Sequence, residues 1–291
     1  MTRIAFSTRM QVIGSISQLR TALDERRRRG VPIALVPTMG ALHEGHLQLV
    51  DQALRHAAVS VLSIFVNPLQ FGPREDFGRY PRNVERDAEL AKGRGAEILF
   101  VPSSEEMYAR ERVITIAPGP LAHRWEGAVR PGHFTGVLTV VAKLFNIVQP
   151  QVAVFGQKDI QQVTLVKEMV RDLDFPVNVV VVPTVREADG LALSSRNAYL
   201  VPEERQQALV LVRALRALNS AFRRGVSAGR ALESVGLQII ASVPAVRLDY
   251  LAVVDGRRME SVERATHGDL AIVAARVGGT RLIDNIVLGS V

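Results

Sequence analysis

The stretch Ala34-Leu35-Val36-Pro37-Thr38-Met39-Gly40-Ala41-Leu42-His43-Glu44-Gly45-His46-Leu47 decides the fold of the first half of the chain. The apolar run over residues 31–36 predicts a buried strand, which Pro37 and Gly40 end, and helical spacing resumes at Leu47. The first amides of a helix lack intrahelical partners and the helix dipole is positive there, so this junction favours a phosphate. Gly40 and Gly45 allow close backbone approach, and His43 and His46, three residues apart, face the same side.

Two other interpretations of the histidine pair stay open. A metal site is one, but the zinc-protease helix places its histidines at i and i+4 around a glutamate, whereas the spacing here is i, i+3. A purely structural pair is the other, with His43 capping the helix and His46 filling a crevice. The preceding strand and the flanking glycines favour the phosphate interpretation.

Length and composition indicate an ordinary globular protein. The 291 residues are enough for about two domains, each with its own core. Hydrophobic residues make up 47% and charged residues 22%, and the absence of cysteine excludes disulfides and thiolate chemistry. The sequence has neither an apolar run long enough to cross a bilayer nor a signal-peptide core near its start, so we expect a cytoplasmic protein without a membrane partner.

The formal net charge of +7 suits either a nucleic-acid binder or an enzyme with anionic substrates. The densest basic run, residues 26–29, ends an early predicted helix, where cations complement the helix dipole. Aromatic residues make up only 5%, and no stacking platform for bases is evident. Anionic small substrates are therefore the favoured interpretation, and no nucleic-acid partner is expected.

The alternation of apolar runs and helical patterns predicts an α/β fold. A Rossmann-like parallel sheet is expected in residues 1–183, with strands near 31–36, 59–66, 98–102, 113–116, 152–155 and 177–182. The pattern of predicted elements changes after Pro183. Two helical patterns, 202–224 and 228–241, and three strand-like runs, 247–254, 270–277 and 280–288, predict a smaller α+β domain over residues 184–291.

Polar groups follow several of the predicted strands, where ligands bind in open parallel sheets. Asn67 and Gln70 end the second strand, although a plain proline turn would explain them too. Lys158 follows Gly156 at a strand end, placed to hold a phosphate as a point charge. The remaining candidates are Arg130 and His133 in a loop before a helix, Gln162 one turn into the next helix, and a hydroxyl- and arginine-bearing loop over residues 189–197. Asp87 and Glu89 are carboxylates that magnesium could use, although a solvated helix face explains Glu89 equally well.

Taken together these loops indicate an ATP-using enzyme that works by positioning and cations. The chain resembles the pantothenate synthetase (pantoate–β-alanine ligase) family, within the nucleotidyltransferase-like superfamily that carries a HIGH-type motif. The resemblance rests on five motifs in family order: residues 37–46, Phe65-Val66-Asn67-Pro68-Leu69-Gln70-Phe71-Gly72, Arg130-Pro131-Gly132-His133-Phe134, Phe155-Gly156-Gln157-Lys158-Asp159 and Leu193-Ser194-Ser195-Arg196-Asn197.

The resemblance implies ATP-dependent condensation of (R)-pantoate with β-alanine to pantothenate, AMP and pyrophosphate through pantoyl adenylate. It implies catalytic roles for His43, His46, Lys158 and Arg196, and ATP contacts from Met39, Gly40, His43, His46, Gly156, Lys158, Asp159, Val185, Leu193, Ser194, Ser195 and Arg196. It implies a site for pantoate and β-alanine at Asn67, Gln70, Arg130, His133 and Gln162. It also implies that Mg²⁺ binds with ATP, with Asp87 at the position of its protein ligand, and that the protein is a homodimer. A nucleotidylyltransferase that keeps the nucleotide on its product stays open as the rival. We further expect the second domain to act as a lid, hinged at residues 183–189.

Overall fold

The computed structural model describes residues 10–73, 75–108 and 113–290. The chain forms two compact units that interleave along the sequence. The N-terminal unit comprises Met1–Ala117, Gly132–Phe155 and Val166–Val182, and the C-terminal unit comprises Pro118–Pro131, Gly156–Leu165 and Pro183–Val291.

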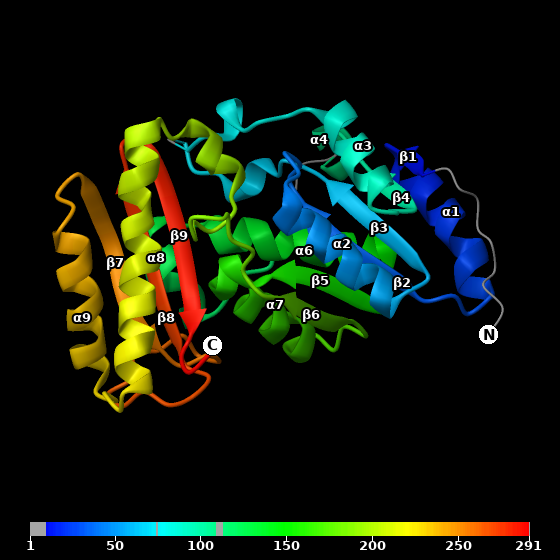
Figure 1. Cartoon of the computed structure of the whole chain (residues 1–291). Coiled ribbons are helices and arrows are strands. Elements are labelled where there is room, and N and C mark those ends of the chain that lie inside the picture. The colour runs from blue at the N-terminus through cyan, green and yellow to red at the C-terminus, as the bar shows by residue number, and fades with distance from the viewer. Residues whose placement is uncertain (1–9, 74, 109–112, 291) are drawn as a thin grey trace. The chain divides into compact units, whose positions relative to one another are not determined.

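A six-stranded sheet in the order β1-β4-β3-β2-β5-β6 forms the centre of the N-terminal unit (Figure 1). β2 pairs in parallel with both β3 and β5, and β4 pairs in parallel with β3 and β1. The expected Rossmann-like parallel sheet is therefore confirmed. Its strands are β1 (Gln11–Ile13), β2 (Ile33–Thr38), β3 (Val59–Ile64), β4 (Ile98–Phe100), β5 (Val152–Gly156) and β6 (Asn178–Val182).

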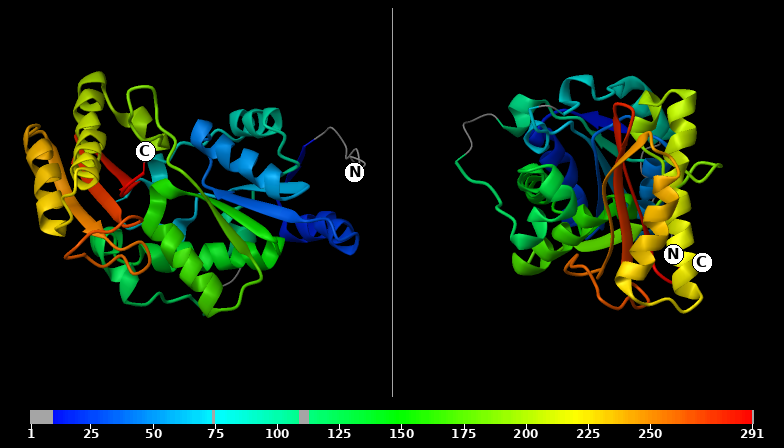
Figure 2. Two further views of the ribbon diagram at one scale, coloured as in Figure 1. Left: turned by 60° about the horizontal axis from the view of Figure 1, so that its bottom comes forward. Right: turned by 90° about the vertical axis from the view of Figure 1, so that its left-hand side faces the viewer.

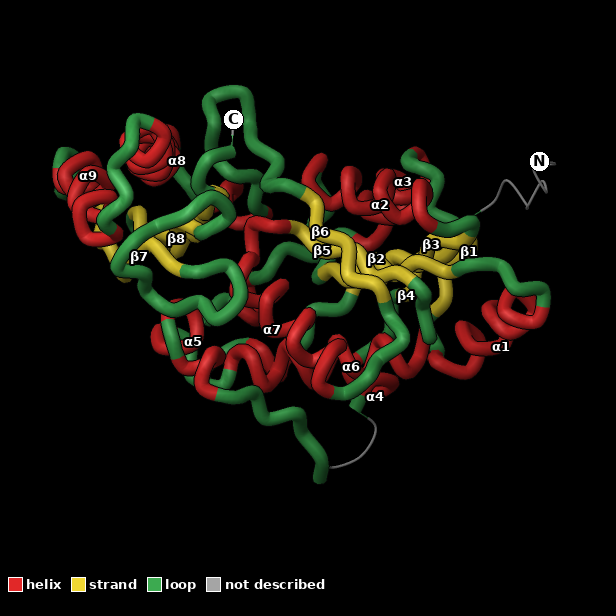
Figure 3. Tube along the Cα trace, turned by 90° about the horizontal axis from the view of Figure 1, so that it is seen from below, coloured by secondary structure: helices red, strands yellow, loops and turns green. Residues whose placement is uncertain are grey.

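Helices cover both faces of this sheet, which explains why β3 is buried along its whole length and β2 over its first four residues. Figure 3 shows α2 (Glu44–His56) and α3 (Val84–Gly93) on one face, and α1 (Ile16–Arg28) and α6 (His133–Val148) on the other. The side chains of Ser15 and Asn83 accept backbone N–H bonds as N-caps of α1 and α3, which explains why these helices begin there. Two shorter helices belong here as well, α4 (Ser104–Met107) and a 3₁₀ turn, η2 (Phe77–Arg79).

The strand expected at residues 113–116 is wrong. These residues pair with no described strand, and the side chains of Val113 and Ile114 are 92% and 77% exposed. A β-branched run favours extended backbone whether or not a neighbouring strand exists, so the pattern alone could not show that a partner is missing. Conversely, the three-residue strand β1 was too short to give a pattern, and it adds to the sheet edge beside β4.

The C-terminal unit contains the antiparallel sheet β7 (Val246–Val254), β8 (Leu270–Val277) and β9 (Thr280–Val287), which confirms the expected small α+β fold. α8 (Pro202–Arg223) and α9 (Gly229–Ala241) pack on one face of it (Figure 2). Their apolar faces form one core with the sheet, around Leu211, Leu215 and Val273. This unit also takes in the short helix α5 (Trp125–Val129), the 3₁₀ turns η3 (Pro120–His123), η4 (Gln157–Asp159) and η5 (Ser195–Tyr199), and the first residues of α7 (Ile160–Asp172).

No helix within the described part of the chain is long and apolar enough to span a membrane.

Candidate active site

The histidine pair lies at the carboxyl end of β2, as the sequence predicts. The His43 and His46 rings stack with their centroids 4.0 Å apart, and the His43 N–H donates to His46 Nδ1 at 3.4 Å. α2 begins at Glu44, with His43 as its extended N-cap residue. Both imidazoles therefore stand at a helix N-terminus, where the dipole favours an anion.

Most backbone N–H groups before the helix are already bonded within the protein. The Gly40 N–H donates to Thr38 Oγ1 at 3.2 Å, and the N–H groups of Ala41 and Leu42 donate to the Asp87 carboxylate. A side chain at Gly40 would place its Cβ 2.9 Å from Ile64 Cγ2, and φ at Gly40 is +81°. Gly40 is thus required by the turn and its packing.

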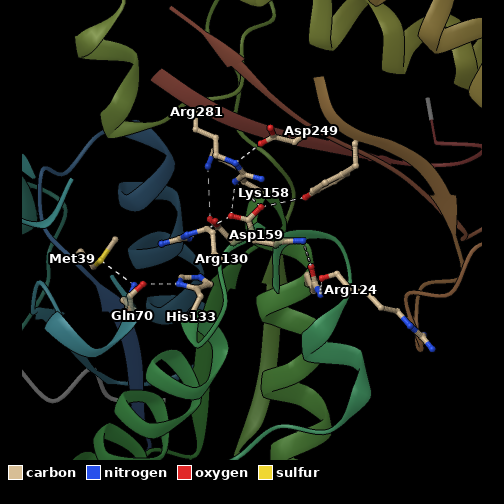
Figure 4. Close-up of polar contacts among 12 residues, drawn as sticks. Met39, Gln70, Arg124, Arg130, His133, Lys158, Asp159, Asp249 and Arg281 are labelled. Atoms are coloured by element: carbon tan, nitrogen blue, oxygen red, sulfur yellow. Dashed lines mark hydrogen bonds and ion pairs between the residues drawn. The ribbon is translucent and has the colours of Figure 1, made fainter. Parts of the chain in front are cut away.

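The amide side chains after β3 lie beside the β2 loop, because these neighbouring parallel strands end at the same sheet edge. Gln70 Nε2 lies 3.2 Å from Met39 Sδ, which confirms the expected proximity of the two loops (Figure 4). Gln70 is held in turn by Asn67, whose Nδ2 donates to Gln70 Oε1 at 3.0 Å. The other end of the Asn67 amide is bonded as well, since Oδ1 accepts hydrogen bonds from the Leu69 N–H at 3.2 Å and from the Tyr108 hydroxyl at 2.9 Å.

The start of α6 fixes the same turn, the 3₁₀ element η1 (Pro68–Gln70). His133 Nδ1 lies 2.8 Å from the Gln70 carbonyl oxygen, and Asn67 Nδ2 also donates to the Gly136 carbonyl at 3.1 Å. A Cβ at Gly136 would lie 2.2 Å from the Leu69 carbonyl oxygen, so only glycine permits this approach. Asn67 and His133 therefore act as buried supports that orient Gln70.

Lys158 lies in the turn η4 after β5, in the C-terminal unit. Its Nζ is 3.9 Å from Asp159 Oδ2, and about a fifth of its side chain is exposed. Asn285 of β9, itself buried, donates through Nδ2 to the carbonyls of Gln157 at 3.0 Å and Lys158 at 2.9 Å. Gln157 Nε2 returns a bond to Asn285 Oδ1 at 3.1 Å, so one asparagine secures the backbone of the lysine turn.

Arg130 belongs to a charged cluster in the C-terminal unit, part of which Figure 4 shows. The buried Glu126 carboxylate lies 2.7 Å from Arg281 Nη1 and 3.4 Å from Arg130 Nη1. Burial opposes the charge of Arg281, yet the Glu126 carboxylate outweighs it and holds the pKa of the guanidinium above its usual value. Burial, together with the charge of Glu126, raises the pKa of Tyr250, which contacts Glu126 Oε2 at 3.3 Å and so stays protonated.

Two consecutive glutamines at the start of α7 have different environments. Gln161 is buried and fully bonded, since its Oε1 accepts the Glu126 N–H at 3.0 Å and its Nε2 donates to the carbonyls of Leu121 and Arg124, both at 3.0 Å. Gln162 is half-buried, and its side-chain amide makes no hydrogen bond with the described residues. Of the two, only Gln162 has a side-chain amide without a hydrogen bond to the described residues, and its contact with a substrate stays a prediction.

The hydroxyl- and arginine-bearing loop is anchored inside the C-terminal unit. Ser194 caps η5 by accepting the Arg196 N–H at 3.2 Å, and the Leu193 N–H donates to the Val185 carbonyl at 2.9 Å. Arg205 of α8 pairs with Glu187 and Asp189 at 2.7 and 2.6 Å. Although burial opposes it, the Leu191 N–H and Arg205 hold the pKa of Asp189 below its usual range.

The residues that the structure describes contain no group of three or more His, Asp or Glu side chains suited to hold a metal. Asp87, the expected magnesium position, is 1% exposed, and each of its carboxylate oxygens accepts one backbone N–H at 2.8 Å. The Asp87 carboxylate therefore holds the backbone of residues 41 and 42.

Several supporting residues were not predicted from the sequence. Asn285 is one, although the pair Asp284-Asn285 lies between the apolar residues Ile283 and Ile286 and could have drawn attention to it. Tyr108, Gln161 and Arg281 are others, and their partners lie about 40 to 155 residues away along the chain. Local pattern carries no signal for such contacts.

The parallel sheet, with a histidine-bearing helix start at its carboxyl edge, defines an α/β protein of the nucleotide-binding class. The family model described as pantoate-beta-alanine ligase matches residues 11–287, and the chain belongs to this family.

Individual relatives agree with that assignment. A pantothenate synthetase of Acidobacterium capsulatum is 53% identical over 286 residues, covering 94% of this chain and 96% of the relative. The solved pantothenate synthetase of Thermus thermophilus superposes with a TM-score of 0.92 at 50% identity, covering 96% and 99% of the two chains. A Francisella tularensis pantoate-beta-alanine ligase, solved with beta-gamma ATP and beta-alanine, has a TM-score of 0.81 at 31% identity, with 97% and 99% coverage.

Proposed function

We propose that this protein is the ATP-dependent ligase that joins (R)-pantoate to β-alanine. The observation that carries the proposal is family membership over residues 11–287, together with all five motifs present in the chain. The Francisella tularensis relative, solved with beta-gamma ATP and beta-alanine, supports the choice of two of the three substrates.

The reaction we propose has two balanced steps. In the first, a pantoate carboxylate oxygen attacks the α-phosphorus of ATP, forming a C–O–P linkage while the bond to the β-phosphate oxygen breaks and pyrophosphate leaves. In the second, the β-alanine amine attacks the acyl carbon, an amide forms, and AMP leaves with the former carboxylate oxygen. The amine loses one proton in this step. The enzyme is thus an AMP-forming ligase that needs no covalent protein intermediate.

The phosphate contacts are proposed from residues of the family motifs. His43 and His46 stand at the dipole-positive start of α2, a suitable environment for triphosphate oxygens. Lys158 and Arg196 would supply the cations that balance the charge developing at the α-phosphorus. The remaining ATP contacts are proposed from Met39, Gly40, Gly156, Asp159, Val185, Leu193, Ser194 and Ser195.

Pantoate recognition is assigned to Gln70 and Gln162. Asn67 and Met39 contact the side-chain amide of Gln70 and His133 contacts its backbone carbonyl, so the amide is preorganised to read a hydroxyl or carboxylate. The Gln162 amide has no partner among the described residues. Asn67 and His133 contribute by holding Gln70. Arg130 is a proposed contact for a substrate carboxylate, because residues 130–134 match the family motif.

Magnesium is proposed as the counterion of ATP, held by triphosphate oxygens and water. The carboxylate of Asp87 is engaged with backbone amides, so no step is assigned to a protein-bound metal here.

We retain the lid proposal for the C-terminal domain, with a narrower hinge. Arg186 pairs with Asp284 at 2.6 Å, and Glu187 and Asp189 pair with Arg205, so residues 186–189 belong with the C-terminal unit. Val185 accepts the Leu193 N–H, so the proposed hinge narrows to residues 183 and 184, the last of the five points at which the chain passes between the units. Because Asn285 holds the backbone of Lys158, we expect this lysine to move with Ser194 and Arg196.

A homodimer and a cytoplasmic location are also proposed. The exposed side chains of Val113 and Ile114 are apolar surface that a second copy of the N-terminal unit would cover. Dependence on ATP suits the cytoplasm.

An omission assay tests the proposed function against a nucleotidylyltransferase. The purified protein is incubated with ATP, Mg²⁺, pantoate and β-alanine, leaving out one substrate at a time, and products are identified by mass spectrometry. Pantothenate and free AMP should form only when all three substrates are present. A product that keeps the nucleotide when β-alanine is present would establish the rival activity.

A further inference from the structure

The buried carboxylate of Asp87 links α3 to the loop that carries the nucleotide-binding histidines. Asp87 Oδ2 accepts the Ala41 N–H and Asp87 Oδ1 accepts the Leu42 N–H, both at 2.8 Å. Ala41 and Leu42 are the two residues immediately before His43. The Asp87 side chain is 1% exposed, so its charge depends on these bonds for compensation.

The loop backbone is in a conformation that it would not favour by itself. Gly40 has φ +81° and Ala41 has φ +51°, so two successive residues lie in the left-handed region. An alanine with positive φ is uncommon and persists only where its surroundings fix it. The carboxylate supplies such a constraint, because bonds from N–H groups to an ionised acceptor are stronger than neutral ones.

A neighbouring arginine reinforces the same connection. Arg86 Nη1 donates to the Leu42 carbonyl at 3.2 Å and lies 3.8 Å from Asp87 Oδ1. On the other side, a Cβ at Gly40 would lie 3.0 Å from Asp87 Oδ2, so the carboxylate packs directly against the turn. Both the polar groups and the shape of the turn are thus matched to a carboxylate at position 87.

We propose that Asp87 is a positioning residue for ATP, which fixes the 40–42 turn and thereby directs His43 and His46 toward the phosphates, and that it does not ligate magnesium. The proposal rests on the proposed function for the identity of the nucleotide. The geometry of the carboxylate and the left-handed turn carries the rest.

The test compares Asp87→Asn and Asp87→Ala with Glu89→Ala, an exposed carboxylate on the same helix, as the matched control. The asparagine keeps one acceptor but turns an N–H₂ toward the second backbone N–H, so it disturbs the turn at nearly constant volume. Ring resonances of selectively labelled histidine are recorded without nucleotide or metal. Pantoate-dependent pyrophosphate release is then measured at varied Mg²⁺ concentration.

The expected result is that both Asp87 variants shift the His43 and His46 resonances in the metal-free protein. Pyrophosphate release at saturating Mg²⁺ should fall by roughly 100-fold, the order expected when reacting groups are displaced by about 1 Å. The Mg²⁺ concentration for half-maximal rate should stay within about twofold of the parent, and Glu89→Ala should change none of these.

Two results would overturn the proposal. One is unchanged histidine resonances together with a tenfold or larger rise in the Mg²⁺ requirement, which would make Asp87 a metal ligand. The other is unchanged resonances with an unchanged rate. If Asp87→Ala does not fold, the test uses Asp87→Asn and the double variant Ala41→Gly/Asp87→Asn. Glycine at position 41 adopts positive φ without cost, so the double variant should regain part of the rate that Asp87→Asn loses. The histidine resonances are measured without catalysis, so this test of Asp87 stands even if the omission assay disproves the proposed function.

Discussion

Replacing Gly136 with alanine tests how the start of α6 orients the proposed pantoate site. The new Cβ would lie 2.2 Å from the Leu69 carbonyl oxygen and 2.7 Å from the Gln70 nitrogen, so η1 and α6 must separate by about 0.8 Å to reach even 3.0 Å. Overpacking of this kind costs about 1–3 kcal/mol. The bond from Asn67 Nδ2 to the Gly136 carbonyl would weaken too, adding about 1 kcal/mol, so we expect a loss of roughly 2–4 kcal/mol.

Urea unfolding monitored by circular dichroism gives the loss of stability, and the pantoate dependence of the reaction gives the functional effect. Because Gln70 moves with η1, KM for pantoate should rise by roughly tenfold or more, while KM for ATP changes little. Gly93→Ala is the control, since this glycine ends α3 and a Cβ there meets no atom within 4 Å. A Gly136→Ala protein as stable as the parent, with the parent's KM for pantoate, would refute this reasoning.

Three further predictions concern the C-terminal unit. Lys158→Ala should lower the rate of pyrophosphate release by roughly 100- to 1,000-fold without loss of stability. The control Lys167→Ala, which changes an exposed lysine on α7, should leave the rate unchanged. Near-parental release by Lys158→Ala would show that Lys158 does not act on the phosphates. Asn285→Ala leaves the carbonyls of the lysine turn without their donor, so the free energy of unfolding should fall by about 2–4 kcal/mol and KM for ATP should rise; a change in neither contradicts its role. Asp189 has a lowered pKa in the folded protein, so its ionised form stabilises the fold above the ordinary pKa, and this stabilisation is lost as pH falls through the lowered value. Asp189→Asn should therefore make the free energy of unfolding depend less on pH on the acid side. An unaltered dependence would argue against the ion pair with Arg205.

Much of the fold could be predicted from the sequence because the strands and helices of this chain have strong periodic patterns. β3 is buried along its whole length, and α1 and α3 begin at side chains that cap them, so pattern and structure agree there. The segment at 113–116 failed because pairing depends on a neighbour that the local sequence does not specify. The interleaving of the two units was equally hidden, since the turn around Lys158 belongs with β9 through Asn285.

The candidate site could be located from the sequence more easily than its parts could be given roles. Met39 and Gln70 are close because parallel strands end at one sheet edge, which topology alone predicts. The roles of Asn67, His133 and Asp87 depend on which atoms they contact, and each of these side chains bonds to another part of the protein. A residue type suited to bind substrate is equally suited to bind a backbone amide, so composition could not separate the two uses.

The fate of the pantoate carboxylate oxygen tests the central claim, attack of pantoate on the α-phosphorus of ATP, most directly. Pantoate labelled with ¹⁸O in both carboxylate oxygens is turned over with ATP and β-alanine, and the AMP and inorganic phosphate are analysed by mass spectrometry. Transfer through pantoyl adenylate predicts one ¹⁸O in each AMP and none in phosphate. Unlabelled AMP, or ADP with ¹⁸O in the released phosphate, would contradict the account.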